Sequence, residues 1–128
     1  MDIIIGWQKY ETEFSGGKVG MELRPLSREA MLLVSPQMAY FAKLKDGAEP
    51  DEAKGFDKLL GLQGVCAKVF PAHVKEITGI MVKESADAQA VPVTIEQITY
   101  ESMFAALCTD IMTKLFTMSV VSKDQAKN

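Results

Sequence analysis

The hydrophobic positions of the chain are most regular in its last third, from Thr94 to Val121. Apolar residues recur there at spacings of three and four, as on one face of a helix: Phe104, Leu107, Cys108, Ile111, Leu115 and Met118. Thr94 and Gln97 fit a capping box, in which the threonine hydroxyl accepts from the Gln97 amide and the glutamine side chain bonds back to the cap. The pattern predicts a C-terminal helix over about 95–121.

The apolar surface of this predicted helix is wider than contact with a single core requires. Met103, Met112 and Phe116 lie beside the main stripe and broaden it. Large exposed apolar patches are uncommon on monomers, so a surface of this kind indicates a partner. We therefore expect these three residues to bind protein, and we expect the chain to self-associate through the same helix.

The first 24 residues show strand alternation instead of helical spacing. Val19, Met21 and Leu23 alternate with small or charged residues, and the run Ser15-Gly16-Gly17 is a turn signal. The pattern predicts an antiparallel β-hairpin over about 3–24, with one face in solvent.

Helical spacing returns over about 27–70, in two regions joined by a loop at 46–50. Ser27 fits an N-cap, Pro36 predicts a kink or the start of a new helix, and Pro71 is expected to end the second region. Residues 74–82 favour a short strand, and 84–90 favour an exposed loop. Together the segments predict one α+β domain over 1–128, mainly helical with an N-terminal antiparallel β-hairpin.

Charge and hydropathy exclude two classes of partner. The net charge is −3, and the basic residues are scattered without a stripe interleaved with aromatics, so we expect no nucleic-acid binding. The longest apolar run, Met103 to Cys108, is too short to span a bilayer, so we expect no membrane partner. The first residues lack the charged leader of a signal peptide, which favours the cytoplasm.

The residues that usually carry catalysis are few and isolated. His73 is the single histidine and follows Pro71, so it is interpreted as a cationic or hydrogen-bonded residue near a helix end. Cys66 and Cys108 lie on apolar helical faces, which indicates small, buried and reduced core residues. We therefore expect no catalytic activity, no cofactor and no metal site.

The order of segments resembles a known family. Leu23–Ser27 leads into a helix, His73-Val74 into a strand, and Val91–Glu96 into a long helix before the polar tail Ser122–Asn128. This layout, over about 23–128, is similar to tail assembly chaperones of long-tailed bacteriophages and prophages. The resemblance implies a protein of the host cytoplasm that binds the tape measure protein and keeps it soluble during tail assembly. It also implies the short form of a protein often made in two lengths, with the tail-tube protein as a further candidate partner.

The alternative is a small-ligand-binding or regulatory cytoplasmic domain. Its pocket would lie between the hairpin and the helices, lined by Trp7, Phe14 and methionines. The eight methionines of the chain suit either function, because flexible thioethers fill cores and also coat adaptable binding surfaces.

Overall fold

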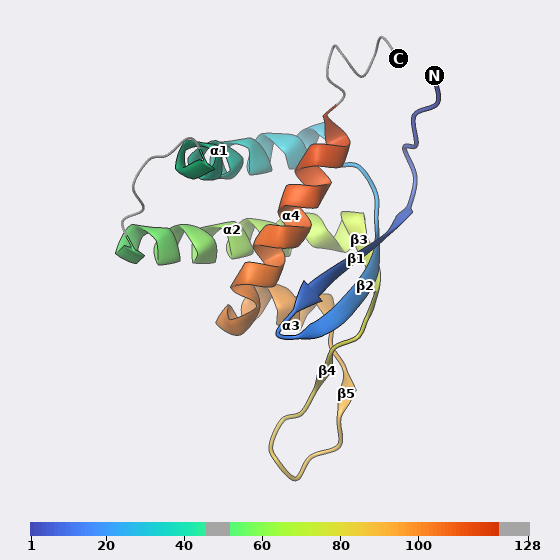
Figure 1. The fold of residues 1–128 in the computed structure, drawn as a ribbon, viewed down its shortest axis with the longest axis vertical. Helices are drawn as coiled ribbons and strands as arrows, with labels where there is room; N and C mark the ends of the chain where they lie inside the picture. The colour runs from blue at the N-terminus through green and yellow to red at the C-terminus, as the bar shows by residue number, and fades with distance from the viewer. Residues whose placement is uncertain (46–51, 121–128) are drawn as a thin grey trace.

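The computed structural model describes residues 1–45 and 52–120, so the predicted loop at 46–50, Val121 and the polar tail lie outside the described residues. The elements follow in this order: β1 (Gln8–Phe14), β2 (Gly17–Leu23), α1 (Arg28–Lys45), α2 (Glu52–His73), β3 (Val74–Thr78), β4 (Met81–Val82), β5 (Val91–Pro92), α3 (Ile95–Tyr100), the 3-10 turn η1 (Ser102–Phe104) and α4 (Ala105–Ser119) (Figure 1). The predicted α+β class, mainly helical with an N-terminal antiparallel hairpin, is confirmed.

The first three strands form one antiparallel sheet in the order β1-β2-β3. Ser15 and Gly16 both have positive φ, 51° and 81°, which is the backbone of a tight two-residue hairpin turn. In β2, Val19, Met21 and Leu23 are buried while the residues between them are partly exposed. The predicted alternation and turn are therefore confirmed. The hairpin extends from Gln8 to Leu23, so it is shorter than the predicted range 3–24.

Helix α4 lies at the centre of the molecule. It crosses α2, and the three-stranded sheet lies beside it (Figure 1). The ring of Phe14 on β1 packs against Phe104 just before α4, with ring centroids 5.7 Å apart. One core therefore joins sheet and helices, and its largest fully buried members include Leu23, Val34, Leu62, Phe70, Ile98, Leu107, Ile111, Met112 and Leu115.

The predicted continuous helix over 95–121 is wrong, because the chain breaks it after Tyr100. Glu101 is extended, with φ −78° and ψ 122°, before η1 and α4 begin. The buried side-chain amide of Gln63 on α2 donates to the carbonyls of Ile98 and Glu101, at 2.8 and 2.6 Å. Carbonyls at a helix end lack partners within the helix, so Gln63 stabilises the break from a distant part of the sequence.

Both helix starts predicted from side-chain caps are confirmed. Thr94 and Gln97 form the reciprocal capping box of α3, at 2.9 and 3.1 Å. The Ser27 hydroxyl accepts from the Ala30 amide at 3.2 Å at the start of α1. These contacts use residues three positions apart, which is why the sequence alone identifies them.

The two prolines do not divide the helices. Helix α1 continues through Pro36 to Lys45, so no new helix begins there. Pro71 lies inside α2, which ends at His73. The predicted end at about residue 70 is wrong by one turn of helix.

The predicted strand over 74–82 is divided into β3 and β4 at Gly79. This glycine has φ +98°, and a Cβ there would lie 2.2 Å from the Lys18 carbonyl oxygen, so only glycine fits. Strand β4 pairs with β5, which the sequence did not predict. Residues 81–92, here called the arm, extend away from the helices and carry the predicted exposed loop 84–90 (Figure 1).

Candidate protein-binding cleft

The three predicted protein-binding residues lie in three different environments. Met112 has 0% of its surface exposed and belongs to the core. Phe116 is partly buried and packs against that core. Met103 is 72% exposed. Of the three, only Met103 offers a large apolar surface to a partner, and Met112 is not available for the predicted self-association.

The N-terminal hairpin contacts α4 through polar side chains. The Tyr10 hydroxyl donates to the Asp110 carboxylate at 2.7 Å, and the Thr12 hydroxyl donates to the same carboxylate. Burial and the Asp110 carboxylate raise the pKa of Tyr10, so its hydroxyl keeps the proton that it donates. Asp110 therefore anchors the hairpin to α4.

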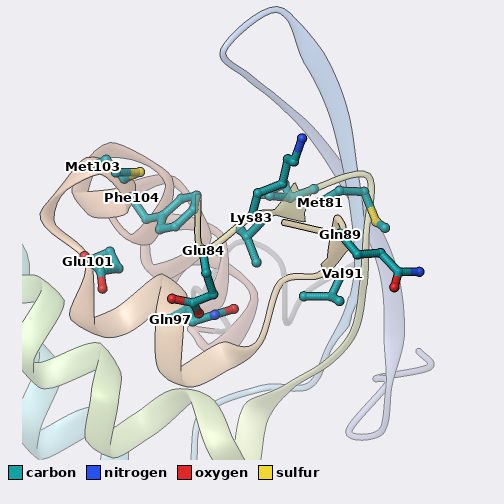
Figure 2. A pocket seen from close by; sticks show the side chains of 11 residues that line it. Met81, Lys83, Glu84, Gln89, Val91, Gln97, Glu101, Met103 and Phe104 are labelled. Atoms are coloured by element: carbon teal, nitrogen blue, oxygen red, sulfur yellow. The ribbon is translucent and has the colours of Figure 1, made fainter. Parts of the chain in front are cut away.

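A cleft of about 570 Å³ lies between the arm and the α3–η1 segment. Figure 2 shows Met103 and Phe104 of η1 on one side and side chains of the arm on the other. The rim carries Lys83, Glu84 and Glu101, so charges of both signs surround it. The apolar lining consists of Ile80, Met81, Val82, Val91, Met103 and Phe104.

Contacts at the base of the arm position this cleft. Gly79 lets the chain leave β3 close to the hairpin, and the Val93 amide donates to the Ile80 carbonyl at 3.1 Å where the arm closes. On the opposite side, Gln63 holds the end of α3. Because the helix breaks there, η1 turns and leaves the side chain of Met103 in solvent at the cleft.

The cleft is suited to apolar side chains. Met81 and Val91 on the arm are 59% and 48% exposed, and Met103 of η1 lines the same cleft. Methionine is flexible and polarisable, so such a surface adapts to partners of different shape. The residues of this cleft that sequence reasoning missed belong to the arm, whose two-residue strands are too short to show a periodic pattern.

The reactive side chains lie away from the cleft. His73 is buried, its Nδ1 donates to the Pro25 carbonyl at 3.1 Å, and burial lowers its pKa. Cys66 and Cys108 are free and fully buried, as predicted, and burial raises the pKa of the Cys66 thiol. The Cys108 thiol donates to the Ile98 carbonyl at 3.2 Å. The imidazole therefore favours its neutral form, and the Cys66 thiol keeps its proton.

The aromatic residues of the predicted ligand pocket make other contacts. Phe14 packs on Phe104 and fills the space between hairpin and helix. The Trp7 ring lies 4.3 Å from Lys75 Nζ and 5.5 Å from Arg24 Cζ, in cation–π contacts at the edge of the sheet. Neither Trp7 nor Phe14 lines the cleft at the arm.

The described residues contain neither a metal-binding cluster nor a helix that could span a membrane. Within residues 1–45 and 52–120, no three histidine, cysteine or acidic side chains gather as a metal-binding group. In the same part of the chain, every helix is too short or too polar to cross a bilayer.

Comparison of the chain with protein-family models, with curated proteins and with solved structures gave no match. The cleft and the exposed apolar residues therefore carry the functional proposal.

Proposed function

We propose that this protein is a non-catalytic tail assembly chaperone of a long-tailed bacteriophage or prophage, which binds the tape measure protein and keeps it soluble. The observation that carries the proposal is the exposed, methionine-lined cleft between the arm and η1. The resemblance of residues 23–128 to that family supplies the identity of the client. A surface of this kind binds protein segments without chemistry, as a chaperone must.

The cleft suits an amphipathic helical segment of the client. Such a segment presents apolar side chains at spacings of three and four, and one of these would enter between Met103 and the arm. Burying one exposed apolar side chain contributes only about 1.5–3 kcal/mol, so a single contact is weak. Many copies bound along one long client gain by avidity, which makes weak sites sufficient for solubilisation.

The proposal is tested by co-expressing the chain with the long tape-measure gene of the same genome. We expect a soluble complex with the parent protein and an insoluble client with Met103→Glu, because that variant places a charge in the apolar cleft. Phe56→Glu is the matched control, since Phe56 is also exposed but lies on α2 and does not line the cleft. A client that stays insoluble and unbound with the parent protein would refute the function.

Salt gives a second readout of the same complex. Screening weakens contacts between exposed charges, whereas the proposed contact is apolar and the chain has a net charge of only −3. The complex should therefore persist in high salt. Release at moderate ionic strength would show that charges, not the cleft, hold the client.

Small-ligand binding is the second candidate, and the volume of the cleft favours it. The cleft measures about 570 Å³, and pockets for small molecules measure roughly 300–1,000 Å³. Native mass spectrometry of the purified protein separates the two functions. A retained small molecule that is lost in Met103→Glu would favour the ligand-binding domain over the chaperone.

A further inference from the structure

Strand β1 is an edge strand with one unpaired side. It stands at the end of the sheet order β1-β2-β3, and within residues 1–45 and 52–120 no other strand pairs with its second side (Figure 1). Bulges and prolines are common features that keep an edge from pairing with another chain. Strand β1, which is described along its whole length, pairs with β2 in an unbroken register and contains no proline. It therefore offers a regular template for a further strand.

The hairpin turn determines which backbone groups of β1 point away from β2. Because the turn has two residues, Phe14 and Gly17 on either side of it are a hydrogen-bonded pair. Such pairs alternate along an antiparallel ladder, so the even-numbered residues of β1 bond to β2. The odd-numbered residues direct their amide and carbonyl groups outward. This side of β1 is here called the open edge, and its residues are Lys9, Glu11 and Glu13.

The open edge is held in position and carries charges. The even-numbered side chains of β1 are half-buried, and two of them, Tyr10 and Thr12, bond to Asp110 on α4. The odd-numbered side chains lie on the opposite face of the sheet and are exposed. Along the edge their charges are positive, negative and negative. A partner strand therefore meets a fixed backbone bordered by a defined charge pattern.

The surroundings of Glu11 favour a further cation. Across the hairpin Glu11 lies opposite Gly20, so the position facing it on β2 has no side chain to pair with the carboxylate. Glu11 also borders a hollow of about 380 Å³ on this face of the sheet. The other charged residues that line the hollow are Lys9, Glu22 and Glu76, so carboxylates outnumber cations there.

The charge pattern is complementary to itself in one register. Opposite charges directly across an antiparallel pair stabilise it, and like charges destabilise it. If Lys9 lay opposite Lys9 of the partner subunit, two cations would meet. If Lys9 lay opposite the partner subunit's Glu13, the two copies of Glu11 would meet. Only with Lys9 opposite the partner subunit's Glu11 do two ion pairs form without a like-charged pair.

We propose that the open edge of β1 pairs antiparallel with β1 of a second copy of this chain, with Lys9 opposite the partner subunit's Glu11. The two-fold axis then passes beside Tyr10, and the three-stranded sheets of the two copies become one continuous sheet. A symmetric pair uses the same edge on both copies, so each copy closes the open edge of the other. Charged side chains can protect an edge from pairing, and here they disfavour the registers that align like charges.

The small size of the contact makes this dimer reversible. The seven residues of β1 span about 23 Å, and paired strands lie about 4.8 Å apart. One strand pair of this length covers far less than the roughly 800 Å² per partner of a standard interface. The dimer should therefore form at high protein concentration and dissociate on dilution.

Sedimentation velocity of the full chain, from low micromolar to millimolar concentration, tests the edge. We expect the parent protein to dimerise as concentration rises. Glu11→Lys should raise the dissociation constant by at least about tenfold, because cations then meet at both symmetric positions. Glu13→Lys is the matched control, since Glu13 is also exposed on β1 but lies opposite the uncharged Trp7 of the partner subunit in this register. A parent that stays monomeric, or an equal loss in two variants that are folded by circular dichroism, overturns the proposal.

Cysteine cross-linking tests the register without reversing a charge. In the proposed pair the Cα atoms of Lys9 and of the partner subunit's Glu11 lie about 5.5 Å apart, within the range of a disulfide. Two copies of one residue are two positions out of step and lie roughly 8 Å apart, beyond that range. A mixture of Lys9→Cys and Glu11→Cys proteins should therefore cross-link under mild oxidation, and neither variant should do so alone.

Two results of the cross-linking experiment would overturn the register. The native cysteines are buried, so they leave the readout clear. Self-cross-linking of Glu11→Cys would show that the two copies of Glu11 face each other. A mixture that does not cross-link, at concentrations where sedimentation detects a dimer, would show that another surface forms the dimer.

The open edge is separate from the cleft between the arm and η1, here called the Met103 cleft. None of the residues described as lining that cleft belongs to β1. Met103→Glu should therefore leave the dimer intact even though it is expected to abolish binding of the client. Loss of the dimer in Met103→Glu would contradict the placement of the contact on β1.

Discussion

Replacing Met112 by alanine separates a core role from an interface role for this residue. Met112 has 0% of its surface exposed, so the substitution removes three buried heavy atoms and leaves a cavity. Such a change costs about 2–5 kcal/mol of the free energy of unfolding, out of a total of roughly 5–15 kcal/mol for a domain. At about 4 °C for each kcal/mol in a chain of this size, the melting temperature should fall by roughly 8–20 °C.

Urea denaturation measures this loss directly. The transition is followed by circular dichroism and by the fluorescence of Trp7, the single tryptophan of the chain; the midpoint should fall with little change in slope. Met103→Ala is the matched control, because Met103 is 72% exposed and its loss should stay within about 0.5 kcal/mol. If Met112→Ala proved as stable as the control but dissociated an oligomer, Met112 would lie at an interface and its placement in the core would be wrong.

Two further perturbations probe buried or half-buried polar groups. Asp110→Ala leaves the hydroxyls of Tyr10 and Thr12 without their acceptor, so we expect a loss of about 1–3 kcal/mol in urea denaturation; an unchanged midpoint would show that Asp110 does not anchor the hairpin. Burial lowers the pKa of His73, so below about pH 6.5 the unfolded chain binds a proton that the folded chain resists, and stability should fall as pH decreases through this range. His73→Gln should flatten the dependence of the urea midpoint on pH between about 7 and 5, and a parent protein with the same flat profile would contradict the assignment.

Features that depend on neighbouring residues could be predicted from the sequence. The Thr94–Gln97 capping box needs only two side chains three positions apart. The hairpin follows from alternation in β2 and from a turn at Ser15 and Gly16 that accepts positive φ. The burial of both cysteines follows from their apolar helical faces. In each case the chemistry that determines the structure lies within one or two turns of the chain.

Features that depend on distant contacts could not be predicted in the same way. The helix break after Tyr100 contains no proline or glycine, and its stabilising donor, Gln63, lies 38 residues away from Glu101. The burial of Met112 depends on the packing of α4 against elements that are distant in the sequence, such as α2. Periodicity indicated that the C-terminal helix carries surplus apolar surface. It did not show that Met112 on that surface would be buried in the core.

The physical character of the Met103 cleft explains why we assign it a client of varied sequence. A rigid surface with defined charges would suit one fixed partner. The Met103 cleft is bounded by an arm whose strands have only two paired positions, and its methionines adapt their shape. An adaptable surface suits varied sequences along a long client, because no single register has to be satisfied.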